Sequence, residues 1–140
     1  VPAEAAAIHG ITDAMLAEAP TWSEIHARFC DLVEGRQVVI YNHEFDVRVI
    51  GQTARRYGLP APQGFDLVLD PGRIHCAMQA YARFRGEWSE EKGRYRWQKL
   101  SAAAAQQGVT VTNAHRALGD CLMTLGVVRA MASTENAQGV

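Results

Sequence analysis

The chain has 140 residues, a length that suits one domain built around one hydrophobic core. Apolar residues make up 48% of it and charged residues 21%, which is the composition of a globular protein and excludes a disordered one. The net charge of −1 excludes attraction of nucleic acid by the whole surface, so any such contact must come from a local group of charges.

The cysteines Cys30, Cys76 and Cys121 are odd in number and have no paired spacing. This pattern argues against a disulfide framework or a zinc knuckle and predicts a reducing, cytoplasmic location. No apolar run approaches the roughly 18 residues that a membrane span needs, and no secretory signal is visible, so no membrane partner is expected.

The first third of the chain carries clear helix signals. Thr12 is expected to cap a short helix that runs to about Glu18. Thr21 and Glu24 then have the spacing of a capping box, which predicts a second helix that ends at Gly35.

The next segment reads as a strand followed by a helix. Gln37–Tyr41 is a short apolar run rich in β-branched residues, which predicts a buried parallel strand. A helix is expected from about Glu44 to Tyr57, with Gly58 directly after it. Prolines and glycines over residues 59–74 predict a connection, with Phe65–Leu69 as a candidate strand inside it.

The second half is expected to be mostly helical. Helices are predicted over His75–Phe84 and Trp97–Gln107, with a polar loop over residues 85–95 between them. A last helix, capped by Thr112 or Asn113 and running through Met131, has an apolar stripe at helical spacing, formed by Leu118, Leu122, Leu125 and Val128. The overall pattern is α/β, with many helices and few strands.

Two short segments carry residues suited to metal-dependent hydrolysis. His115 precedes Asp120 by five residues at the start of the last helix, and Asn42–Asp46 closes the apolar strand. Two-metal phosphodiester hydrolysis uses aspartates and glutamates to hold hard cations, and a histidine can take the proton of the attacking water. Five residues on a continuous helix place two side chains roughly 140° apart, so His115 must leave helical geometry to face the same site as Asp120.

Each of these residues also has an ordinary structural interpretation. An aspartate in the first turn of a helix usually caps it or favours its dipole, and Asp46 alone would be interpreted in that way. Asn42 can cap the helix that carries Asp46 or contact a substrate. The combination carries the weight, because Asp46 lies just beyond the carboxyl end of a strand, where open α/β sheets place their ligands.

Five segments occur in an order that resembles a known family. They are Ala6–Thr12, Ala19–Trp22, Val38–Asp46, Tyr95–Leu100 and His115–Asp120. Together they resemble the DEDDh 3′–5′ exonucleases, whose type member is the proofreading epsilon subunit of bacterial DNA polymerase III. The similarity extends along most of the chain.

This resemblance implies an RNase H-like α/β fold, Mg²⁺ or Mn²⁺ as cofactor, and removal of nucleotides from the 3′ end of a single-stranded nucleic acid. DNA is the expected substrate, proofreading the expected role and a polymerase subunit a candidate partner. The implied catalytic residues are His115 as base and Asp46 and Asp120 as metal ligands. The implied substrate-binding residues are Ile8, His9, Thr12, Asn42 and Phe45.

The family's first motif, Asp-x-Glu on the first strand, does not occur in this chain. We therefore expect residues 1–140 to be an N-terminally incomplete exonuclease domain that lacks the first three strands of the fold and is inactive alone. A homodimer would not restore the missing carboxylates, although an oligomer stays open. The alternative is a non-catalytic exonuclease-like module that binds nucleic acid or a polymerase partner.

Two further features received a structural interpretation. Basic and aromatic residues alternate over Lys92–Lys99, a pattern that can follow the backbone of a single nucleic-acid strand. We favour the alternative, a solvated loop whose Trp97 packs into the core. His43, beside Asn42, can touch a substrate, but we expect it to be a solvent-exposed turn residue.

Overall fold

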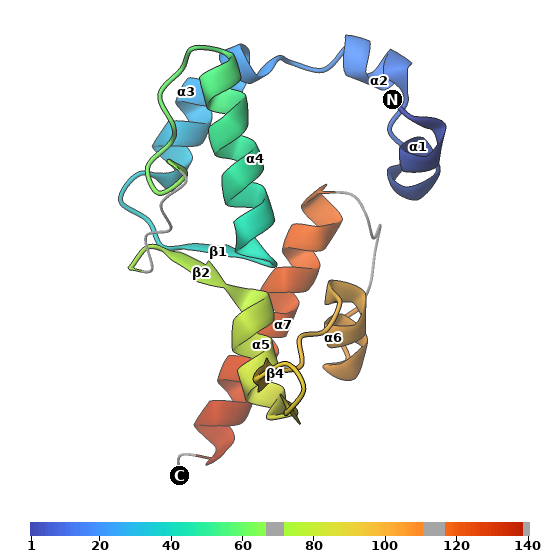
Figure 1. Ribbon diagram of the computed structural model, residues 1–140, viewed down its shortest axis with the longest axis vertical. Helices are drawn as coiled ribbons and strands as arrows, with labels where there is room; N and C mark the ends of the chain where they lie inside the picture. The colour runs from blue at the N-terminus through green and yellow to red at the C-terminus, as the bar shows by residue number, and fades with distance from the viewer. Residues whose placement is uncertain (67–71, 111–116, 139–140) are drawn as a thin grey trace. The chain divides into compact units, whose positions relative to one another are not determined.

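The computed structural model describes residues 1–66, 72–110 and 117–138, with side chains as far as residue 134. These residues form two compact units: unit 1 holds residues 1–39 and 43–75, and unit 2 holds residues 40–42 and 76–140. Helices alternate with a few short strands in the described part of the chain (Figure 1), in agreement with the predicted α/β class. The assignment of residues 1–140 to a single domain stays a prediction.

Unit 1 begins with two short helices, α1 (Ala3–His9) and α2 (Asp13–Ala17). The Thr12 side-chain oxygen accepts a hydrogen bond from the Met15 backbone N–H at 3.3 Å, so the predicted cap of α2 is confirmed. This bond satisfies one of the backbone donors that a helix leaves open at its start.

Helix α3 (Trp22–Val33) begins as the capping-box pattern predicts. The Thr21 backbone N–H donates to the Glu24 carboxylate at 2.7 Å, and the Thr21 hydroxyl donates to the same carboxylate at 2.6 Å. The helix ends before Gly35, whose φ of 67° is a left-handed conformation that glycine adopts without a steric cost.

Helix α4 (His43–Arg56) packs beside α3 (Figure 1), close to the bounds that the sequence predicts. Aromatic rings of α3 continue into the following connection: Trp22 and Phe29 have ring centroids 5.5 Å apart, as do Phe29 and Phe65. The buried His26 lies among them, and its Nε2–H donates to the Pro60 carbonyl at 2.8 Å. The hydrogen bond offsets the cost of burying the histidine.

Strands β1 (Val38–Ile40) and β2 (Ile74–Cys76) form a two-stranded sheet. The β1 prediction is confirmed in position but wrong in burial, because Val39 is 46% exposed. The helix predicted from His75 begins later, as α5 (Ala77–Arg85). The buried, β-branched Ile74 explains the difference, since strand pairing and burial there override the helical pattern.

Unit 2 is built from α5, α6 (Leu100–Gln106) and α7 (Ala117–Gln138), and both α5 and α6 pack against α7 (Figure 1). Its core is a buried cluster formed by Tyr81, Ala103, Ala104, Met123 and Val127. The Tyr81 hydroxyl donates to the Gln106 side chain at 2.8 Å, so the buried ring keeps a partner for its polar end. Helix α6 begins three residues later than predicted because Lys99 is still extended.

The predicted apolar stripe of the last helix does not face the core. Leu118, Leu122 and Leu125 are 71%, 52% and 44% exposed, whereas Met123 and Val127 are buried. The prediction was wrong because α7 carries apolar residues on all sides, so spacing alone does not select the buried face. The helix also continues past Met131, its predicted end, to Gln138.

The predicted loop over residues 85–95 contains a hairpin of two short antiparallel strands, β3 (Trp88–Ser89) and β4 (Arg94–Tyr95). The expectation that Trp97 packs into the core is also wrong, because this side chain is 46% exposed.

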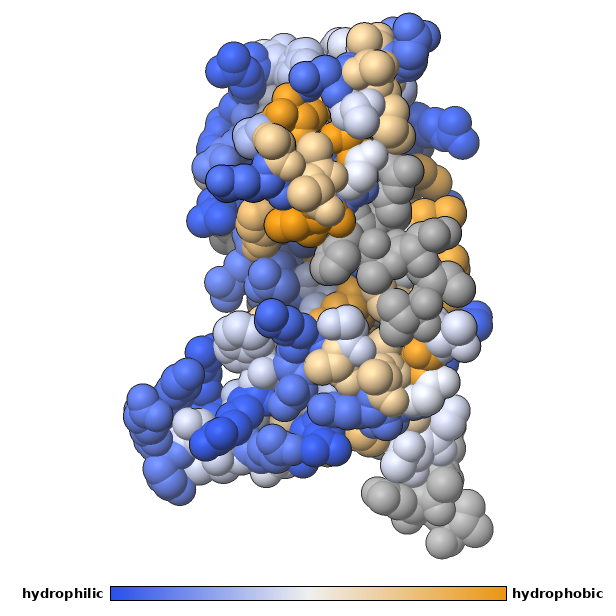
Figure 2. Space-filling model, turned by 90° about the vertical axis from the view of Figure 1, so that its right-hand side faces the viewer, coloured by the Kyte–Doolittle hydropathy of each residue, from blue (hydrophilic) through white to orange (hydrophobic). Residues whose placement is uncertain are grey.

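Apolar side chains gather at the surface among hydrophilic ones on the face shown in Figure 2. Within the described ranges, the exposed apolar residues include Val39, Phe45 and Val49. None of the helices over these ranges is both long enough and apolar enough to cross a lipid bilayer. The candidate strand Phe65–Leu69 lies mostly outside the described residues.

Candidate active site

The turn between β1 and α4 positions the first predicted metal ligand. Asn42 has a φ of 61°, in the left-handed region that asparagine tolerates better than most residues. This single conformation ends the extended segment, so that α4 begins at His43 and Asp46 falls in its first turn. The local sequence therefore places a carboxylate at a helix N-terminus directly after a strand.

The Asp46 carboxyl is half-buried, and burial raises its pKa above the ordinary value. No salt bridge to Asp46 is formed within the described part of the chain. Partial burial without a cation partner makes the charged form of a carboxylate less stable than it is in water. A bound cation would offset that cost.

Two neighbours of Asp46 differ from one another in burial. Phe45 is 53% exposed, with the Arg48 guanidinium 6.0 Å from the centre of its ring, so it is accessible as a predicted substrate contact. His43 is only 8% exposed, and its buried Nδ1 has no hydrogen-bond partner among the residues that the structure describes. The expectation of a solvent-exposed His43 is therefore wrong: the left-handed turn at Asn42 brings the ring into the first turn of α4 and away from solvent.

The second predicted ligand, Asp120, lies in unit 2, in the first described turn of α7. Its side chain is half-buried, and its backbone carbonyl accepts a hydrogen bond from the Thr124 hydroxyl at 2.8 Å. The next turn of the helix enters the core with Met123 and Val127. Packing of these residues fixes the helix that carries Asp120.

The remaining predicted residues are placed as follows. Ile8 is exposed on α1, the His9 Nδ1 accepts from the Ile11 backbone N–H at 3.0 Å, and Thr12 caps α2. Over the described ranges, no hydrogen bond or ring contact joins these three residues to Asp46. The predicted base, His115, lies outside the described residues, as does the cap predicted at Thr112 or Asn113.

The donor chemistry of Asp46 and Asp120 suits Mg²⁺ or Mn²⁺, since hard cations take carboxylate oxygens and keep several waters or substrate phosphates as further ligands. In the described part of the chain, however, no group of three histidine, cysteine, aspartate or glutamate residues could hold a metal ion. Each carboxylate is of the chemical type that can ligate such a cation, and a site for two metals needs more ligands than either one supplies.

Comparison with known proteins identifies the family. Residues 1–128 match the family model described as Exonuclease (RNase_T). The chain therefore belongs to this exonuclease family, and the resemblance to DEDDh-type exonucleases is confirmed at the level of the family. Membership implies a nuclease with an RNase H-like α/β fold, and this family generally uses divalent metal ions.

Similar proteins carry matching names. The chain is 52% identical over 133 residues to the Uncharacterized exonuclease CP81 of Escherichia phage 186. The aligned region covers 94% of the chain and 67% of the phage protein. It is 32% identical over 127 residues to a DNA polymerase III subunit epsilon-like protein of Rhodobacter capsulatus, covering 89% of the chain but 16% of that protein. It is also 33% identical over 78 residues to the DNA polymerase III subunit epsilon of Haemophilus influenzae, covering 56% of the chain and 30% of the subunit. No solved structure matches the chain.

Proposed function

We propose that this protein is a metal-dependent 3′–5′ exonuclease that removes nucleotides from single-stranded 3′ ends. DNA is the proposed substrate, and proofreading beside a DNA polymerase is the proposed role, because relatives are named as epsilon subunits of DNA polymerase III. The observation that carries the proposal is Asp46: a half-buried carboxylate with a raised pKa, placed after a strand in a chain of the exonuclease family.

In this proposal Asp46 and Asp120 bind divalent metal ions, which when bound polarise the scissile phosphate and lower the pKa of water. His115 accepts the proton of the attacking water, since an imidazole titrates near neutral pH. The residues proposed to hold the terminal nucleotide are Ile8, His9, Thr12, Asn42 and Phe45.

Further metal ligands are proposed to come from outside residues 1–140. Two facts support this: the chain contains no Asp-x-Glu, and the aligned region leaves about a third of the phage relative uncovered. The absence of the first three strands from residues 1–140 is part of the same proposal.

A second candidate is a non-catalytic exonuclease-like module that binds nucleic acid or a polymerase. The lack of an Asp-x-Glu motif in residues 1–140 favours it. The two candidates differ in one outcome, since only the first predicts that the protein shortens a strand when metal is added.

The test uses protein made from the complete coding sequence and a single-stranded oligonucleotide labelled at its 5′ end, with Mg²⁺, Mn²⁺ or a chelator. The proposal predicts a ladder of products shortened from the 3′ end, seen only with metal and abolished by Asp120→Asn. Asp31→Asn, which changes an exposed carboxylate on α3, is the matched control and should keep full activity. A ladder that survives Asp120→Asn would reject the assigned site, and no ladder under any condition would support the binding module.

A further inference from the structure

The hairpin β3–β4 presents an ordered aromatic pair. Trp88 lies opposite Tyr95 in the strand register, and their rings meet edge to face with centroids 5.2 Å apart. The Arg96 backbone N–H donates to the Glu87 carbonyl at 2.8 Å, which extends the pairing beyond the two strands. Cross-strand pairs of this kind stabilise a hairpin and hold its side chains in fixed directions.

The segment after the hairpin is fixed to the core of unit 2. The Tyr41 hydroxyl donates to the Gln98 carbonyl at 2.8 Å, and burial raises the pKa of Tyr41 to about 12, so the donor keeps its proton at any physiological pH. Tyr41 itself packs against the buried cluster. Trp97, which directly precedes this anchor, therefore has a defined backbone position.

The rings of the hairpin region stay outside the core of unit 2, which includes two alanines. Trp88, Tyr95 and Trp97 are 48%, 39% and 46% exposed, while Ala103 and Ala104 are fully buried. Burial of such rings would stabilise the fold by more than burial of methyl groups, because their apolar area is larger. Their exposure leaves aromatic surface on unit 2 available to a ligand.

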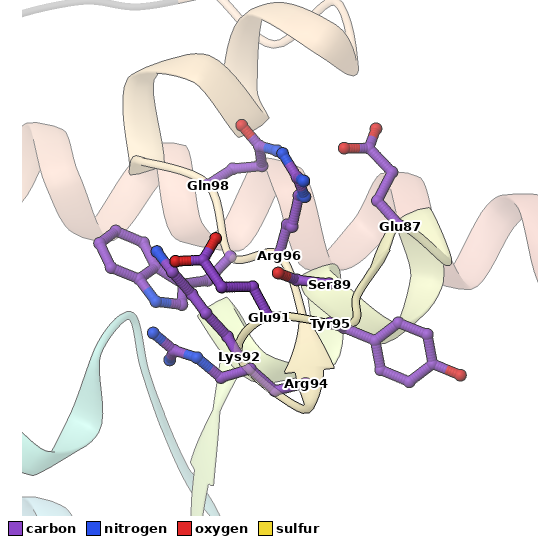
Figure 3. Close-up of a pocket in the computed structure, with 9 residues that line it drawn as sticks. Glu87, Ser89, Glu91, Lys92, Arg94, Tyr95, Arg96 and Gln98 are labelled. Carbon is purple, nitrogen blue, oxygen red and sulfur yellow. The ribbon is translucent and has the colours of Figure 1, made fainter.

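Cations accompany the exposed rings. A pocket of about 400 Å³ lies beside the hairpin, lined in part by Lys92, Arg94, Arg96 and Trp97 (Figure 3). The Arg94 guanidinium lies 5.8 Å from the centre of the Trp97 ring. Lys92 and Arg94 extend away from Tyr95 in Figure 3, on the side where the Glu91 side chain also lies.

Two carboxylates also line the pocket and oppose an anionic ligand. Glu87 is paired with Arg85, which neutralises its charge locally. No ion pair of Glu91 is formed within the described part of the chain, so Glu91 remains as the group that weakens anion binding. The pocket is still lined by more cationic side chains than carboxylates. Whether Glu91 weakens the binding of an anion can be tested by substitution.

We propose that the hairpin and Trp97 form a binding surface for a single nucleic-acid strand, with a base stacked on Trp97 and phosphates held by Lys92 and Arg94. This proposal rests on the proposed function, because the strand that binds this surface of unit 2 would be the substrate of the exonuclease. An apolar protein partner fits less well, because Lys92, Arg94 and Arg96 line the same pocket as Trp97. An aromatic ring beside cations is the combination that binds the bases and phosphates of a single strand.

The test measures binding of a fluorescent single-stranded oligomer of about 20 thymidines by anisotropy, in a chelator, so that hydrolysis does not interfere. Trp97→Ala should weaken binding about tenfold or more, and Trp97→Phe should restore most of it, because a flat ring still stacks. A duplex of the same length should be insensitive to Trp97→Ala, since its bases are already stacked. Equal binding by wild type and Trp97→Ala would overturn the proposal.

Charge variants test the phosphate contacts separately. Replacing Lys92 and Arg94 together by Ala should lower the slope of log affinity against log salt by about 1.4, which is the loss of two phosphate contacts on a single strand. Replacing Arg55 and Arg56, two exposed arginines at the end of α4, is the matched control and should leave the slope unchanged. Glu91→Gln should strengthen binding, and weaker binding by this variant would contradict the assigned charges.

The outcomes separate this surface from the proposed activity. Strand binding that depends on Trp97, without hydrolysis when metal is added, would uphold the surface and reject the exonuclease. Hydrolysis from the 3′ end with no effect of Trp97→Ala on strand binding would uphold the exonuclease and reject the surface. Oligomers of uridine and deoxyuridine differ only in the 2′-hydroxyl and identify the preferred sugar. Loss of the Trp97 dependence with both oligomers would overturn the proposal.

Discussion

The two units each carry one predicted metal carboxylate in the first turn of a helix, but they stabilise that turn differently. In unit 2, Asp120 lies one turn before Met123, so the site and the core occupy successive turns of α7. In unit 1, Asp46 is itself half-buried and its carboxyl has a raised pKa. In unit 2, substitutions should therefore affect either activity or stability. In unit 1, substitution of Asp46 should affect both.

The largest expected effect concerns activity alone. In the complete protein, His115→Ala should lower turnover about 10²- to 10⁴-fold through loss of the general base, with little change in melting temperature. Single-turnover hydrolysis and a thermal melt of the same preparations measure both quantities. His75→Ala is the control, since this histidine is exposed and bonded to Gln37. A parallel fall in activity and melting temperature would identify His115 as a packed structural residue.

The next effect concerns stability alone. Met123→Ala should lower the free energy of unfolding by about 2–5 kcal/mol, because it leaves a cavity in the buried cluster. The adjacent Leu122→Ala should cost about 0.5 kcal/mol or less, since that side chain is half exposed. Denaturant titration measures both variants. Similar costs at the two positions would mean that the exposed leucine stripe is covered in the protein in solution.

A smaller effect is expected where α7 meets the connection after α6. A Cβ at Gly126 would lie 2.5 Å from Val109 Cγ1, so Gly126→Ala should destabilise the chain by about 1–2 kcal/mol despite the better helix propensity of alanine. Val109→Ala in the same chain removes the clashing methyl groups and should recover part of the loss. Additive costs in the double variant would show that the two residues do not meet.

The smallest effect tests the coupling in unit 1. The folded chain holds the proton of Asp46 more tightly than the unfolded chain does, so stability from this group is present below its ordinary pKa and is lost as the pH rises through the raised value. Asp46→Asn should therefore stabilise the metal-free chain at neutral pH, by less than about 1 kcal/mol because the group is half exposed. The gain should vanish in acid.

Glu44→Gln is the matched control for Asp46→Asn, because it removes an exposed carboxylate from the same helical turn. It loses the same favourable interaction with the helix dipole but relieves no burial. Melting temperatures across the pH range compare the two variants. A stabilising Glu44→Gln, or a destabilising Asp46→Asn at neutral pH, would contradict the account of Asp46.

The parts of the fold that the sequence predicts are those set by neighbouring residues. The Thr21–Glu24 capping box and the glycines that follow α3 and α4 act over a few positions, and the structure confirms the helix bounds that they imply. A positive φ at Gly58 marks the end of α4 for the same local reason.

The parts that the sequence does not predict depend on distant contacts. The buried face of α7 is chosen by packing against α5 and α6, and a helix that is apolar on all sides carries no signal for that choice. The hairpin has strands of two residues each, too short for an alternating pattern to be recognised. At the site, burial of His43 depends on the left-handed turn at Asn42, which its sequence permits but does not require.

The most direct test of the central claim is whether Asp46 and Asp120 act in one catalytic centre. The measurement is kcat/KM for strand shortening by the complete protein, compared among Asp46→Asn, Asp120→Asn and the double variant. Ligands of one centre are non-additive, so we predict that the double variant is about as slow as the slower single variant. Costs that simply add, or a single variant with unchanged kcat/KM, would contradict the shared centre and with it the assigned exonuclease site.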